Sequence, residues 1–189
     1  LTIHQYIDSD TSIQLQGDDR AISVKTESGF PWSGAVNITV EQEIQRAFLL
    51  KLRIPGWAES WQVRIDGKLF KSGEKASNPE QTAGGYSPYE SFFLEINREW
   101  GTITSVELLL EMKPVHHHPH PKVSCNKGKT ALSRGPLVYC LEDIDNPNSG
   151  VPEAIIDRNS IIREEESSLL DGNITLQTQD ASGNPLTFI

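Results

Sequence analysis

The residues that most plainly could do chemistry are four histidines in one short segment. His116, His117, His118 and His120 lie within residues 113–121, and neutral imidazole is the commonest protein ligand for zinc and copper. Neighbouring side chains of an extended segment point in alternating directions, so these rings do not converge on one ion without ligands from elsewhere. Three prolines in the same segment oppose regular strand pairing and indicate a linker. We therefore expect a solvated linker here and no metal site.

Aromatic side chains offer a second kind of chemistry, the stacking of a ring on a sugar. Tyr86 and Tyr89 are the candidate substrate-binding residues, because they lie in a polar, Gly- and Ser-rich segment, residues 72–90, that predicts a long surface loop. For these two, sugar binding and ordinary packing remain open alternatives. Trp57 and Trp100 lie at strand ends, where a large ring commonly closes a core, so we expect packing.

Other catalytic signatures are weak or missing. Residues 164–166 are three glutamates in a row, which predicts a solvated face or turn. Residues 143–146 resemble the start of a calcium loop, but Pro147 occupies the next ligand position. Cys125 and Cys140 could form one bridge or two buried thiols, and we expect buried thiols. The sequence has no nucleophile elbow and no phosphate-binding glycine motif, so we predict no catalytic residue.

The elements that must position these side chains are strands. Short runs with period-two alternation recur between turn signals, as in all-β sandwiches, and convincing helical periodicity is absent. Asp66-Gly67 is the best hairpin signal, because this pair tolerates the positive φ of a type I′ turn. The predicted strands are residues 1–7, 12–16, 21–26, 35–41, 47–54, 61–65, 91–96, 105–112, 154–157 and 174–178.

Residues 128–142 predict two short strands joined at a rigid Gly135-Pro136 corner. Leu137, Tyr139 and Leu141 alternate with their neighbours, as on a strand with one face against a core. The favoured two-residue turns need positive φ at one or both central residues, and the proline ring fixes φ near about −65°. We therefore expect a bent or bulged strand at a sheet edge and not a tight hairpin.

Composition bounds the partners and the size of the fold. The chain of 189 residues is long enough for one large or two small domains, and its apolar runs are too short for a membrane span. A net charge of −9 without a basic patch makes nucleic acid an improbable partner. We predict two consecutive antiparallel, jelly-roll-like β-sandwich units, residues 1–112 and 113–189, with 113–121 as the linker and the second unit truncated. A cytoplasmic location is slightly favoured over a secreted one.

Several segments in a fixed order carry a family resemblance. Together they resemble glycoside hydrolase family 127, the β-L-arabinofuranosidase group. The segments are Leu-Thr-Ile-His-Gln-Tyr-Ile at 1–7, Phe-Pro-Trp-Ser-Gly at 30–34, Leu-Arg-Ile-Pro-Gly-Trp-Ala at 52–58, Ile-Asn-Arg-Glu-Trp-Gly at 96–101, Val-Glu-Leu-Leu-Leu-Glu-Met at 106–112, and 128–142.

The resemblance implies that this chain is part of a glycoside hydrolase but does not itself contain the catalytic residues. In that family an (α/α)6 barrel carries the chemistry and β-sandwich domains follow it. The implied reaction is retaining hydrolysis, in which a cysteine thiolate attacks the anomeric carbon, a glutamate is the acid/base, and a zinc ion lowers the thiol pKa. None of these residues matches a position here, so we carry over no catalytic or metal residue and expect zinc only in the barrel. The implied partners are the protein's own N-terminal barrel and, through the parent enzyme, arabinose-containing plant glycans.

Two other functions compete with that of a structural accessory region. A free-standing carbohydrate-binding module would use Tyr86 and Tyr89 as its platform, and a partner-binding domain would leave an apolar sandwich face exposed. The chain opens inside a strand-like run, so we expect it to be part of a longer protein.

Overall fold

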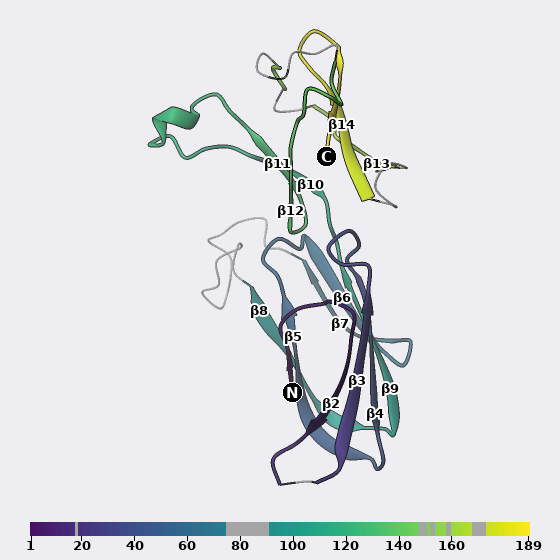
Figure 1. Ribbon diagram of the computed structural model, residues 1–189. Coiled ribbons are helices and arrows are strands. Elements are labelled where there is room, and N and C mark those ends of the chain that lie inside the picture. The colour runs from purple at the N-terminus through teal and green to yellow at the C-terminus, as the bar shows by residue number, and fades with distance from the viewer. Residues whose placement is uncertain (18, 75–90, 148–150, 152–153, 158–159, 168–172) are drawn as a thin grey trace. The chain divides into compact units, whose positions relative to one another are not determined.

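A computed structural model describes residues 1–17, 19–74, 91–147, 151, 154–157, 160–167 and 173–189 (Figure 1). Tyr86 and Tyr89 therefore lie outside the described residues. The chain divides into two compact units, Leu1–Met112 and Lys113–Ile189. The described secondary structure consists of strands and one short 3-10 helix, which confirms the predicted all-β class.

The first unit contains two sheets. A six-stranded antiparallel sheet has the order β2-β3-β4-β9-β6-β7, and a three-stranded sheet has the order β1-β5-β8 with β1 parallel to β5. The strands are β1 Thr2–Ile3, β2 Ser9–Gln14, β3 Ala21–Ser28, β4 Ala35–Gln42, β5 Arg46–Ile54, β6 Ser60–Ile65, β7 Lys68–Glu74, β8 Phe92–Trp100 and β9 Ile103–Leu110.

Period-two alternation explains how both sheets share one core. On β4, Val36, Ile38 and Val40 are buried, whereas the alternate side chains point away from the core. The neighbouring strand β9 places Val106 opposite Ile38, and β5 of the other sheet contributes Leu50 and Leu52 to the same cluster. Because the side chains alternate, each strand covers the core with one face only.

A buried amide ties three turns together at one end of this unit. The Gln42 side-chain nitrogen donates to the Trp100 carbonyl at 2.8 Å and to the Gly101 carbonyl at 2.9 Å. The Gln42 amide oxygen accepts from Arg46 Nε at 2.9 Å, and another Arg46 nitrogen donates to the carbonyls of Arg20 and Ala21, both at 3.1 Å. These bonds satisfy carbonyls that would otherwise lack partners at the strand ends.

Two glycines are required by close approach or by turn geometry. An added Cβ on Gly34 would lie 1.8 Å from the Leu110 carbonyl oxygen, and the Gly34 carbonyl accepts the Leu110 N–H at 2.9 Å. The predicted type I′ hairpin is confirmed, because Asp66 has φ 49°, Gly67 has φ 74°, and Ile65 pairs directly with Lys68.

The second unit is built from two small antiparallel sheets of order β10-β11-β12 and β13-β14-β15. Leu132 and Tyr139 from the first sheet form one core cluster with Leu176, Leu186 and Phe188 from the second. The elements are β10 Pro114–His117, the 3-10 helix η2 Ser124–Asn126, β11 Ala131–Arg134, β12 Leu137–Tyr139, β13 Arg163–Ser167, β14 Asn173–Gln179 and β15 Pro185–Phe188.

The expectation of a bent strand at Gly135-Pro136 is wrong. Arg134 pairs with Leu137, so β11 and β12 form a hairpin with a two-residue loop. Gly135 supplies the positive φ, 56°, at the first central position, and a type II′ turn asks for negative φ at the second, which suits proline. The proline constraint that argued against a hairpin therefore fits one class of hairpin turn.

The expectation of an unpaired linker over residues 113–121 is also wrong in part. Residues Pro114 to His117 form β10, which pairs with β11 from Pro114 opposite Arg134 to His117 opposite Ala131. Pro114 is the first residue of an edge strand, a position where a missing N–H removes no necessary ladder bond. The remaining prolines follow the strand and do not interrupt it.

Two further segments differ from expectation, and a third agrees with it. Of the strand predicted over residues 1–7, only Thr2–Ile3 is extended and paired. Residues 154–157 form no strand. The glutamate run lies on β13, which pairs with β14, and its three residues are exposed, so the predicted solvated face is confirmed and no turn forms here. Among the described residues, no helix is both long and apolar enough to cross a membrane.

Candidate functional site

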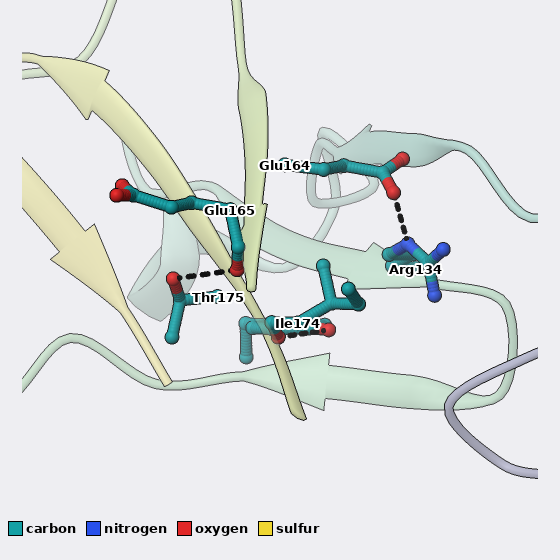
Figure 2. Close-up of polar contacts among 6 residues, drawn as sticks. Arg134, Glu164, Glu165, Ile174 and Thr175 are labelled. Atoms are coloured by element: carbon teal, nitrogen blue, oxygen red, sulfur yellow. Dashed lines mark hydrogen bonds and ion pairs between the residues drawn. The ribbon is translucent and has the colours of Figure 1, made fainter. Parts of the chain in front are cut away.

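A junction of polar contacts joins the two sheets of the second unit. Arg134, the last residue of β11, places its Nε 2.8 Å from a carboxylate oxygen of Glu164 on β13 (Figure 2). The Tyr139 hydroxyl on β12 donates to the Ile174 carbonyl on β14 at 2.8 Å. Both contacts run between strands of different sheets, so they fix one sheet against the other.

The electrostatics of this junction are those of a partly buried ion pair. The Arg134 side chain is only 11% exposed and that of Glu164 is 34% exposed, so water screens the pair less than a surface pair. Burial raises the pKa of the Tyr139 hydroxyl, while the nearby Arg134 charge partly opposes the rise. The hydroxyl therefore stays protonated and serves as a donor.

The junction does not present two carboxylates to one substrate. Successive side chains on a strand point to opposite faces, and Figure 2 shows Glu164 directed at Arg134 while the Glu165 side chain points elsewhere. The Glu165 carbonyl accepts a hydrogen bond from the Thr175 hydroxyl at 3.1 Å. The two-carboxylate mechanism of glycoside hydrolysis needs a carboxyl pair that faces the scissile bond from two sides. We therefore assign these residues to sheet packing.

The histidines lie on and beyond β10 and alternate as predicted. His116 and His118 have nearly parallel rings, with centroids 6.3 Å apart and an interplanar angle of 9°. His117 points elsewhere and places Nε2 2.6 Å from the Ser133 hydroxyl oxygen. Within the described residues, no three His, Cys, Asp or Glu side chains gather closely enough to hold a metal ion.

His116 is the histidine with the most unusual surroundings. Both ring nitrogens are buried, and neither makes a hydrogen bond of normal geometry to another described residue. Burial lowers the pKa of His116, and the neighbouring His118 and His117 lower it further, whereas the nearby Ser160 backbone acts in the opposite direction. The neutral imidazole is therefore the favoured form in the folded unit.

A shallow groove of about 560 Å³ lies in the second unit, between the segment before β13 and the β14–β15 turn. Its polar lining includes Arg163, Gln177 and Asp180. The Asp180 carboxylate is already engaged, because it accepts from the Asn184 side-chain amide at 2.9 Å and from the backbone N–H groups of Ser182 and Asn184, each at 2.8 Å. The Asn184 side-chain bond first, and then the backbone bonds, lower the pKa of Asp180. No aromatic ring lines the groove among the described residues, so it offers no stacking platform for a sugar.

The tryptophans at strand ends serve packing, as predicted. Trp100 is fully buried, stacks on Phe48 with a centroid separation of 5.1 Å, and donates its indole N–H to the Phe48 carbonyl at 2.9 Å. Trp57 is partly buried and packs against the core of the first unit, 6.2 Å from the Phe30 ring.

The expectation of buried thiols is wrong. Cys125 and Cys140 are both free and both exposed. Cys125 lies in η2, at the tip of the segment between β10 and β11. Cys140 exchanges two backbone hydrogen bonds with Ile189, at 2.8 and 2.9 Å, so its place is fixed by the backbone and not by core packing.

Residues that sequence reasoning missed include Asn146 and the pair Arg134 and Glu164. The Asn146 amide bonds the carbonyls of Glu142 and Thr187 and accepts the Thr187 N–H at 2.7 Å, so this residue anchors a turn to β15. Arg134 and Glu164 are 30 positions apart. No local pattern could have joined them, because their contact depends on the packing of two sheets.

The fold and these contacts define a pair of antiparallel β modules whose polar residues mostly hold strands together. The chain belongs to glycoside hydrolase family 127. A family model described as the GH127 middle domain of β-L-arabinofuranosidase matches residues 1–112, and one for the C-terminal domain of the family matches residues 114–186.

Individual relatives agree with this assignment. A non-reducing end β-L-arabinofuranosidase of Bifidobacterium longum subsp. longum is 31% identical over 130 residues, which cover 67% of this chain and 18% of that protein. A crystal structure of a GH127 β-L-arabinofuranosidase from Geobacillus stearothermophilus T6 is 27% identical, with a TM-score of 0.79, over 100% of this chain and 30% of that one. A solved GH127 β-arabinofuranosidase is 25% identical, with a TM-score of 0.76, and the match covers 31% of its length.

The chain therefore spans less than a third of the relatives it matches. The catalytic zinc that the family resemblance implies has no fitting ligand set among the described residues, because Cys125 and Cys140 lie apart from any cluster of three potential ligands.

Proposed function

We propose that this chain is the non-catalytic accessory region of a retaining glycoside hydrolase similar to β-L-arabinofuranosidases. It would support a separate catalytic barrel, and the bond cleavage would take place in that barrel. The observation that carries the proposal is the ordered match to the middle and C-terminal domains of family 127, over a chain that covers only 18% of the curated relative and 30% of a solved one.

The first unit offers a surface that such a barrel could cover. Strand β7 is exposed along nearly all its length, and its apolar residues Leu69 and Phe70 are 57% and 44% exposed. Adjacent exposed apolar side chains on an edge strand favour association, and covering an edge protects it from unwanted pairing. Burying each of these side chains would stabilise the parent by up to about 1.5–3 kcal/mol.

A truncation of the parent protein tests the supporting role. We expect a parent cut before Leu1 to unfold at a lower temperature and to lose most hydrolysis of an aryl β-L-arabinofuranoside. Adding the 189-residue chain in trans should restore part of both properties. If the truncated parent keeps its full stability and activity, the supporting role is wrong.

Replacement of the exposed apolar pair gives a finer test within the full-length parent. Leu69→Ser with Phe70→Ser should lower the melting temperature of the parent, because covered apolar surface would be lost. The matched control is Lys68→Ser with Lys71→Ser on the same strand, which should have little effect. Equal effects of the two double variants would exclude β7 from the barrel contact.

A further inference from the structure

Residues 118–130 form an arm that links β10 to β11 and extends away from the β10-β11-β12 sheet (Figure 1). None of these residues is buried. Successive backbone turns order the tip: Val123 N–H donates to the His120 carbonyl at 2.8 Å, and Lys129 N–H donates to the Asn126 carbonyl at 3.0 Å. The arm thus has a backbone held by turn hydrogen bonds, and none of its side chains is part of the core.

The charge of the arm is opposite to that of the rest of the chain. It carries Lys122, Lys127 and Lys129 and no carboxylate, whereas the remaining residues contain 14 basic and 26 acidic side chains. All three lysines are exposed, and none has an ion-pair partner among the described residues. A cationic segment on an acidic protein attracts anions locally while the body of the protein repels them.

We propose that this arm is a binding site for a carboxylated polysaccharide, which the lysines hold through its uronate groups. Lysine is a compact, rotatable point charge, so a row of lysines suits separated single carboxylates, whereas arginine is preferred for bidentate recognition. The choice of a polysaccharide as the anionic polymer rests on the proposed function, since a glycoside hydrolase encounters polysaccharides.

Other partners fit the arm less well. Protein interfaces are centred on buried aromatic and apolar anchors, and the only large apolar side chain on the arm is Val123, at 41% exposure. Single-stranded nucleic acid binding combines basic residues with aromatic stacking platforms, and residues 118–130 contain no Phe, Tyr or Trp. A polyanion without exposed base faces is the partner that lysines alone can bind.

Isothermal titration of the 189-residue chain with polygalacturonate at low salt tests the proposal. We expect saturable binding, roughly tenfold weaker in 0.3 M sodium chloride because salt screens exposed charges. Neutral arabinan should not bind at the arm. The variant Lys127→Gln with Lys129→Gln should weaken polygalacturonate binding roughly tenfold, and adding Lys122→Gln should abolish it.

The matched control is Lys68→Gln with Lys71→Gln, which removes the same charge from exposed positions on β7. No binding at low salt, or an equal loss in both double variants, would overturn the proposal. It would also be overturned if the arm variant bound the polymer normally but loosened the association of domains in the parent, because the partner would then be a protein.

This result can be separated from failure of the supporting role. The arm variants should leave the melting temperature of the chain and the parent's hydrolysis of a small neutral aryl glycoside unchanged. A parent that is impaired on the small substrate by the arm variants would contradict the arm as a polymer site, whatever the truncation experiment shows.

Discussion

At the scale of single residues, Gly34 shows how backbone contact can fix a residue type. The Leu110 carbonyl oxygen lies where a Cβ on residue 34 would be, 1.8 Å away, so a side chain requires the turn or β9 to move. Backbone cannot yield as the end of a flexible side chain can.

We therefore expect Gly34→Ala to lower the free energy of unfolding by about 1–3 kcal/mol, the typical range for overpacked sites. Urea denaturation measures this loss. The control is Gly101→Ala, whose added Cβ would meet no atom closer than 3.4 Å and should change stability by less than about 1 kcal/mol. Similar values for the two variants would mean that Gly34 is not tightly packed.

Gln42 is a second residue whose side chain stabilises parts of the chain outside its own strand. Its amide makes two donor bonds and one acceptor bond in a buried position. Gln42→Ala should reduce stability by roughly 2–4 kcal/mol, because the Trp100 and Gly101 carbonyls and the Nε–H of Arg46 each lose the hydrogen bond to Gln42. Gln14→Ala removes one exposed bond, to the Asp19 carbonyl, and should reduce stability by less than about 1 kcal/mol in the same denaturation experiment. A small effect at position 42 would contradict the network.

His116 makes the second unit sensitive to acid. Its folded-state pKa is lowered, first by burial and then by His118, so the unfolded chain binds the proton more readily. Stability is therefore fully present above the unfolded pKa of about 6.5 and falls as the pH drops below it.

Amide hydrogen exchange of β10 and β11 at pH 8 and pH 5 measures this effect. We expect protection to fall at pH 5 in the native chain and to fall less in His116→Phe, which cannot be protonated. His120→Gln, in the exposed arm, should behave like the native chain. An unchanged acid response in His116→Phe would assign the effect to other groups.

At the scale of elements, the strands that sequence analysis located are those with an apolar face. Strands β3, β4, β5 and β9 alternate between buried and exposed side chains, and this period is visible in the letters alone. Strand β13 reads Arg-Glu-Glu-Glu-Ser and has no apolar face, so nothing in its pattern could reveal it. The strand forms because it pairs with β14, and its charged composition suits its position at the edge of the sheet.

Of the two hairpin turns discussed, one was predictable from the sequence and the other was not. Asp66-Gly67 matches a preference for positive φ at both central positions, and its hairpin was predictable. The hairpin at Gly135-Pro136 differs from the sequence-based expectation, because Gly135 takes the single positive φ that a type II′ turn needs and leaves the negative φ to Pro136. The polar junction beyond it depends on contacts between sheets and could not be read from the sequence.

Gly135→Ala tests this turn directly. A non-glycine residue at a φ of 56° is strained, so we expect a loss of roughly 1–3 kcal/mol and weaker protection of the Arg134–Leu137 pair. Pro136→Ala should change stability by less than about 1 kcal/mol, since alanine also accepts negative φ. Denaturation combined with amide exchange reports both quantities. Equal tolerance at both positions would contradict the assigned turn.

At the scale of the whole molecule, the described residues mainly pair strands, form two separate hydrophobic cores, and make polar contacts that provide hydrogen-bond partners for backbone groups. The candidate tyrosines at positions 86 and 89 lie outside the described residues, so their role stays a prediction. The family assignment places this chain with the middle and C-terminal domains of enzymes that are several times longer. The hydrolysis that we propose for the longer protein would therefore take place outside this chain.

The most direct test is a turnover assay on purified proteins, with an aryl β-L-arabinofuranoside as substrate and zinc in the buffer. We expect hydrolysis by the full-length parent and none above background by the 189-residue chain at equal concentration. Zinc-dependent turnover by the isolated chain would contradict this expectation.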